Sequence, residues 1–190
     1  MQRCIGLITA AVLWLGVSAA ADAAQVTVTQ VDKNSDGTTT YHFVLKVDQT
    51  ETMGPGNGDA LPADFFTIYN FYGLVDGSVK TPDGWTFTSE ATGRTPAMGG
   101  YPLVLPTDVP GTPNLTWTAT APIKPGTEVA GFSAVTRVGA MTDGTYSAFV
   151  TQRSGPIAGA PGSPGSAAMV AKQALIGMIM TPSFLADLKK

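Results

Sequence analysis

The chain has 190 residues, a formal net charge of −3, 44% hydrophobic residues and a single cysteine. Nucleic-acid binding depends on Lys and Arg clustered along the phosphates. The 11 Lys and Arg residues here are mostly scattered singly, so we expect no nucleic-acid partner. The length suits one domain, with a core large enough to fold without disulfides.

Residues 1–23 have the pattern of a secretory signal peptide. Arg3 precedes the apolar run CIGLITAAVLWLGVSAA, and Ala21-Asp22-Ala23 fits a small-x-small cleavage site. We therefore expect a secreted protein, extracellular or periplasmic, that begins near Ala24. The alternative is an uncleaved membrane anchor, but no basic stop-transfer cluster follows the apolar run. Cleavage would remove Cys4 and leave no thiolate for nucleophilic or metal chemistry.

Residues 24–153 are dominated by short runs of alternating apolar and polar residues. In YHFVLKVD, every second residue from Tyr41 to Val47 is apolar, and LTWTAT at 115–120 repeats the pattern. Such runs are typical of strands with one buried face. Further strands are expected at 65–75, 85–90, 127–138 and 145–153. Asp-Gly pairs at 36–37, 76–77, 83–84 and 143–144, and Asn-Gly at 57–58, are typical of tight hairpin turns.

Seven or eight such strands, with almost no helical periodicity, predict an all-β protein. We expect an antiparallel β-sandwich, Ig-like or jelly-roll-like, over residues 24–153, with a closed barrel as the alternative. The Pro-rich stretch 92–114 is predicted to be a long loop. The Gly/Pro-rich stretch 154–167 is predicted to be a linker.

The last segment, residues 168–190, is predicted to form a short helical C-terminal extension. Apolar residues recur there at helical spacing, interrupted by Lys172 and Gln173, and the run is too short to span a bilayer. We expect this helix to dock either on its own domain or on a partner.

One stretch resembles part of a calcium-binding loop. Asp32, Asn34 and Asp36 alternate and are followed by Gly37. In a helix–loop–helix site the twelfth loop position supplies a bidentate Glu, but here that position is Phe43, and both flanks alternate like strands. We interpret the stretch as a polar turn. A calcium site at these three residues is the alternative.

An aromatic run lies at residues 65–72. Neighbouring positions on a strand face opposite ways, so one set of rings must be core and the other could be exposed. Exposed rings at Phe65, Tyr69 and Phe71 would form a ligand platform for sugars or an apolar partner. In the alternative, both faces of the strand are covered.

Catalytic constellations are not recognisable in the sequence. His42 is the only histidine, lies in a predicted strand and has no Gly-x-Ser-x-Gly elbow to serve. Glu51, Glu90 and Glu128 could supply a glycosidase pair only if the fold brings two of them together across a cleft. We therefore expect no enzymatic activity and no cofactor.

Three phrases resemble known proteins: DFFTIYNFYGLVDGSVKTPDGWTFT, PNLTWTAT and FSAVTRVG. They are similar to phrases in a loose group of uncharacterised secreted bacterial β-rich proteins that often carry a PEP-CTERM sorting tail. The resemblance covers most of residues 40–155. It implies an exported bacterial protein and no catalytic residues. This chain has TPSFLADLKK where the tail would have Val-Pro-Glu-Pro and terminal arginines, so the resemblance does not extend to exosortase-type sorting.

Together these features predict an exported, non-catalytic structural or binding module of a cell surface, matrix or periplasm. A polysaccharide or a cell-surface component would be its partner. The alternative is a small carbohydrate-binding or carbohydrate-active protein that uses the aromatic strand and loop carboxylates.

Overall fold

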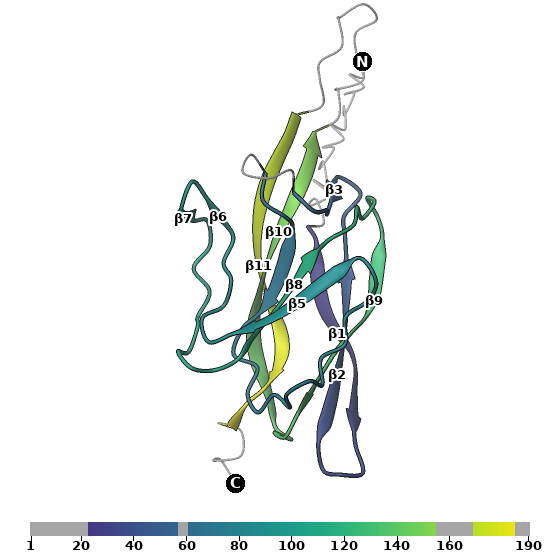
Figure 1. Ribbon diagram of the computed structural model, residues 1–190, viewed down its shortest axis with the longest axis vertical. Helices are drawn as coiled ribbons and strands as arrows, with labels where there is room; N and C mark the ends of the chain where they lie inside the picture. The colour runs from purple at the N-terminus through teal and green to yellow at the C-terminus, as the bar shows by residue number, and fades with distance from the viewer. Residues whose placement is uncertain (1–22, 57–60, 155–168, 185–190) are drawn as a thin grey trace, which may run out of the picture.

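The computed structural model describes residues 23–56, 61–154 and 169–184. The prediction of an all-β, antiparallel protein is confirmed, and these residues contain no α-helix. A three-stranded sheet has the order β1-β2-β9, and a larger sheet has the order β11-β10-β4-β8-β5, with β3 paired to β10 (Figure 1). The bounds are β1 Gln25–Lys33, β2 Thr39–Lys46, β3 Glu51–Thr52, β4 Phe65–Ile68, β5 Trp85–Glu90, β8 Asn114–Ala119, β9 Glu128–Thr136, β10 Met141–Ser154 and β11 Met169–Pro182.

The two sheets pack together through rings contributed by both. Phe43 of β2 lies 5.9 Å from Trp117 of β8, and Phe66 of β4 lies 5.1 Å from Phe132 of β9, measured between ring centroids. The alternation of apolar and polar residues accounts for the burial pattern of β2 in the smaller sheet. Tyr41, Phe43, Leu45 and Val47 are all buried, while their neighbours are more exposed. Burying these rings together with the aliphatic core side chains stabilises the packing of the two sheets.

The larger sheet is covered on its second face as well. All four residues of β4 are buried, and so are five of the six residues of β8. The segment between β5 and β8, which includes the short hairpin β6 (Ala97–Met98) and β7 (Tyr101–Pro102), contributes part of this cover. From it, the Arg94 guanidinium lies 4.0 Å above the Phe65 ring. The predicted loop at 92–114 therefore contains a hairpin, and its part around Arg94 packs onto the sheet.

Three of the predicted Asp-Gly turns are confirmed. Gly37, Gly77 and Gly84 have φ angles of 83°, 71° and 81°, which glycine adopts at little cost. The turn predicted at 143–144 is wrong, because both residues lie inside β10 opposite β11. A Cβ at Gly144 would overlap Thr181 Oγ1, so this glycine permits close strand approach. The Asn-Gly pair at 57–58 lies outside the described residues.

The predicted helical C-terminal extension is wrong over its described part. Residues Met169–Pro182 form β11, which pairs antiparallel with β10 from Met169 opposite Ser154 to Pro182 opposite Met141. The segment also satisfies a two-residue period, since Leu175 and Ile179 pack on the core while Ile176 and Met178 are exposed. Pairing along all of β10 outweighs the weak helical pattern. Residues 185–190 lie outside the described part, as do 1–22 and nearly all of the linker.

Within the described residues, no helix is long and apolar enough to cross a membrane.

Candidate functional site

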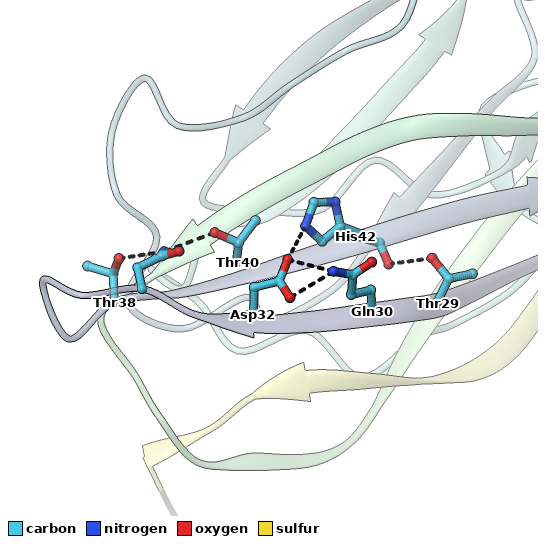
Figure 2. Close-up of polar contacts among 7 residues, drawn as sticks. Thr29, Gln30, Asp32, Thr38, Thr40 and His42 are labelled. Carbon is cyan, nitrogen blue, oxygen red and sulfur yellow. Dashed lines mark hydrogen bonds and ion pairs between the residues drawn. The ribbon is translucent and has the colours of Figure 1, made fainter.

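The first of the calcium candidates belongs to the β1–β2 hairpin. The Asp32 carboxylate accepts two hydrogen bonds from Gln30 Nε2, at 2.8 and 2.9 Å. Its Oδ2 also lies 3.0 Å from Nε2 of His42 on β2 (Figure 2). The hydrogen bond from Gln30 is the main reason that the pKa of Asp32 lies below its usual value. The Asp32 carboxylate therefore interacts with two side chains of the same hairpin, those of Gln30 and His42.

Asn34 and Asp36 stabilise the turn of that hairpin. The Asn34 side chain donates to Thr38 Oγ1 and Thr40 Oγ1, at 2.9 and 3.0 Å. Asp36 accepts from the backbone N–H and the hydroxyl of Thr38, at 3.0 and 2.7 Å, which lowers its pKa. Asn34 and Asp36 thus meet at Thr38, whereas Asp32 is directed elsewhere. In the described part of the chain, no group of three or more His, Cys, Asp or Glu could hold a metal ion.

The proposed aromatic platform is not a surface. Phe65, Tyr69 and Phe71 are 2%, 0% and 0% exposed. The Tyr69 hydroxyl lies 2.8 Å from both Ser147 Oγ and the carbonyl oxygen of Arg94, and burial raises the Tyr69 pKa. These rings are core because both sheet faces are covered, so they cannot serve as an exposed platform.

A buried ion pair that the sequence did not reveal joins Asp64, just before β4, to Lys172 of β11. Lys172 Nζ lies 2.6 Å from Asp64 Oδ1, and both side chains are only 2% exposed. Thr151 of β10 lies between them: its hydroxyl accepts from Lys172 Nζ at 2.9 Å and donates to Asp64 Oδ2 at 2.9 Å. The Gly54 N–H also donates to Oδ2, at 2.9 Å.

The pair lies at a pocket of about 350 Å³ with largely apolar walls. Its lining includes Met53, Leu61, Pro122, Ile123 and Pro125. Burial in these surroundings raises the pKa of Asp64, against the opposing effect of the hydrogen bond from Lys172. The one sequence signal for this centre was a lysine interrupting an apolar run; its partner lies 108 residues away.

A second buried carboxylate binds the beginning of the described chain. Glu51 Oε2 accepts a hydrogen bond of 2.8 Å from the backbone nitrogen of Ala24, and both residues are 2% exposed. Burial raises the pKa of Glu51 above its ordinary value of 4.5. Glu51 pairs with Gln152 of β10, so this contact ties the start of β1 to the larger sheet.

Exposed large apolar side chains gather in two places. One group surrounds the β6–β7 hairpin: Met98, Tyr101, Leu103, Leu105 and Val109. The other lies along the edge strand β11 and at the adjoining start of β10: Met141, Ile176, Met178, Met180 and Phe184. Between the start of β1 and residues 175–178 of β11 there is a groove of about 640 Å³. Exposed apolar groups concentrated in this way are typical of interaction surfaces.

Comparison with protein-family models, with curated proteins and with solved structures found no match.

Proposed function

We propose that this protein is an exported, non-catalytic β-sandwich module, Ig-like or jelly-roll-like, with a structural role. It assembles with a second copy of itself through the edge of β11. Among the residues that the structure describes, no strand pairs with the outer edge of β11, and this observation carries the proposal. β11 is a 14-residue strand at the end of its sheet, and it presents Ile176, Met178 and Met180 at 51%, 68% and 37% exposure.

Edge strands carry unpaired N–H and C=O groups that can template another strand. Proteins usually protect such edges with charged residues, prolines or bulges. β11 contains no charged residue or proline from Gln173 to Thr181, and its pairing with β10 shows no register shift. The charged residue and the proline of β11, Lys172 and Pro182, flank this stretch, so the unprotected part of the edge is residues 173–181. An edge without these protections fits one that is covered by another strand in the assembled protein.

A second copy supplies a strand that matches this edge. Two β11 strands related by a twofold axis are antiparallel, and an axis at Met178 places Ile176 opposite Met180 of the second copy. This register aligns only apolar side chains on the outer face and keeps Lys172 out of the paired region. Each cross-strand pair contributes roughly 0.2–1 kcal/mol, in addition to the backbone hydrogen bonds.

Export is supported by the contact between Ala24 and Glu51. Cleavage after Ala23 would convert the Ala24 nitrogen from an amide into an ammonium group, 2.8 Å from a buried carboxylate. A charged hydrogen-bond partner is what a buried carboxylate needs. The signal pattern of residues 1–23 and this acceptor therefore point to the same mature start.

The carbohydrate alternative has less support. Its ring platform is buried, and the carboxylates of Glu51 and Asp64 are buried with partners of their own. A non-catalytic role is consistent with His42, which contacts Asp32 and lies on the surface of the hairpin.

Sedimentation equilibrium of the protein purified after export tests the assembly. We expect a monomer–dimer equilibrium at protein concentrations up to about 200 µM. At these concentrations a dimer whose Kd is about 200 µM or lower is populated. Met178→Lys should give a monomer, because the charge falls on the twofold axis. Thr88→Lys, on the opposite edge strand β5, is the matched control and should still form the dimer. A monomeric native protein, or a dimer that Met178→Lys leaves intact, would refute the proposal.

A further inference from the structure

The Asp64–Lys172 centre contains more hydrogen bonds than an ion pair alone requires. The carboxylate arrives from the turn before β4 and the amine from β11, and β10 lies between these two strands in the sheet. Oδ1 faces the amine at 2.6 Å, while Oδ2 faces two hydrogen-bond donors, the Gly54 N–H and the Thr151 hydroxyl. The two oxygens of one carboxylate are thus held in different environments.

We propose that Asp64 and Lys172 are the two ends of an intramolecular isopeptide cross-link, formed spontaneously in the folded chain. This inference stands on the geometry of the centre and is independent of whether β11 pairs with a second copy.

The amine and the carboxyl carbon are close enough to react. Because a C–O bond is about 1.2 Å long, the 2.6 Å contact between Nζ and Oδ1 places the carboxyl carbon about 3–4 Å from Nζ. A near-attack arrangement needs about 3–3.5 Å. Attack also requires Nζ to approach the carboxyl carbon from above the carboxyl plane, a position that bond rotation in the four-carbon lysine side chain allows. Because the fold holds the amine and the carboxyl group together in one molecule, their reaction is intramolecular and does not require two solutes to meet.

The reaction is a condensation, and its atoms balance without an oxidant or a cofactor. A proton first passes from the ammonium of Lys172 to Oδ1 of Asp64, giving an amine and a carboxylic acid. Nζ then attacks the carboxyl carbon, and negative charge develops on Oδ2, where Gly54 and Thr151 donate. The C–Oδ1 bond breaks, and Oδ1 leaves as water with its own proton and one proton from Nζ. One C–N bond replaces one C–O bond.

The surroundings favour this outcome in two ways. Burial raises the pKa of Asp64, which favours the protonated carboxyl group that the reaction consumes. Two buried charges are costly to keep out of water, whereas a neutral amide is less so. The amide oxygen would keep the Gly54 and Thr151 donors that Oδ2 now has, and the amide N–H could donate to Thr151 Oγ1, now 2.9 Å from Nζ.

The cross-link would hold the edge strand covalently. Asp64 and Lys172 are 108 residues apart in the sequence, and the bond would tie β11 across β10 to the start of β4. The sequence has a single cysteine, Cys4, which precedes the expected cleavage site, so the mature chain would have no disulfide for this purpose.

Intact-mass spectrometry of the denatured protein tests the proposal. The protein is produced from the full sequence with its export signal, and its N-terminal residue is determined first. We expect a mass lower than that of the sequence by about 18 Da, one water, as this covalent modification requires. Proteolysis should release a branched peptide containing both Asp64 and Lys172.

Variants assign the bond to these two residues. Lys172→Arg and Asp64→Ala should have their full sequence masses, whereas the surface variant Lys80→Arg should keep the deficit. Asp64→Asn should lose ammonia, about 17 Da, through the same bond. Native protein at its full sequence mass, with no branched peptide, would overturn the proposal and leave an ion pair. That result comes from the native protein, so it does not depend on whether any variant folds.

Discussion

Glu51→Gln should destabilise the form of the chain that begins at Ala24 but not the form extended by Ala23. In the first form, the Ala24 nitrogen is an ammonium group facing the Glu51 carboxylate at 2.8 Å. Glutamine keeps the shape but loses the charge. Because hydrogen bonds to charged groups contribute about 1.5–3 kcal/mol, we expect the free energy of unfolding to fall by about that amount. For a chain of this size, the melting temperature should fall by roughly 3–12 °C.

In the extended form, Ala24 offers only an amide N–H. Burial then raises the pKa of Glu51 above 4.5, so between the ordinary and the raised pKa the folded chain binds more protons than the unfolded chain. This contribution to stability is fully present below pH 4.5 and is lost as the pH rises through the raised pKa. Glu51→Gln removes that loss, so at pH 7 it should leave the extended form equally or more stable.

Thermal melts of the four proteins at pH 4 and pH 7 measure these effects. Glu128→Gln, the same loss of charge at an exposed position of β9, is the matched control. If Glu51→Gln shifts the melting temperature equally in both forms, the reasoning that links cleavage to Glu51 is refuted.

Two further predictions test the fold and the β1–β2 hairpin. Gly144→Ala should destabilise the protein by about 1–3 kcal/mol, because the added methyl overlaps Thr181 across the β10–β11 pairing. Gly144→Ala combined with Thr181→Ala should recover much of this loss in urea unfolding, and a neutral single variant would contradict the strand pairing. The melting temperature should be the same in millimolar calcium as in chelator, because Asp32, Asn34 and Asp36 form hydrogen bonds within the hairpin. A rise in melting temperature with calcium would show a site there.

The sequence predicted what depends on local pattern. Alternation from Tyr41 to Val47 predicted a half-buried strand, and Gly37, Gly77 and Gly84 form turns as Asp-Gly pairs predict. Residues 169–182 were misassigned because Ile, Met, Ala and Gly at those positions fit both a helix and a strand. The hydrogen-bonding partner that decides between the two is β10.

Long-range proximity could not be predicted. Whether Phe65 and Tyr69 are exposed depends on the segment that carries Arg94, which covers the second face of β4. The contact between Asp64 and Lys172 spans 108 residues and exists only because β10 brings β11 to the end of the larger sheet. A single sequence carries no local signal for either arrangement.

A cysteine at position 178 tests most directly whether β11 pairs with its own copy. The chain has one cysteine, Cys4, which precedes the expected cleavage site, so Met178→Cys would supply the only thiol of the mature protein. Directly opposed residues of antiparallel strands have Cα atoms about 4.5–5.5 Å apart, within the range for a disulfide. Mild oxidation should convert Met178→Cys largely to a disulfide-linked dimer and leave Thr88→Cys, whose thiol lies on the opposite edge strand, without a disulfide-linked dimer. A Met178→Cys protein that forms no disulfide-linked dimer, or equal amounts of disulfide-linked dimer from both variants, would contradict the assembly.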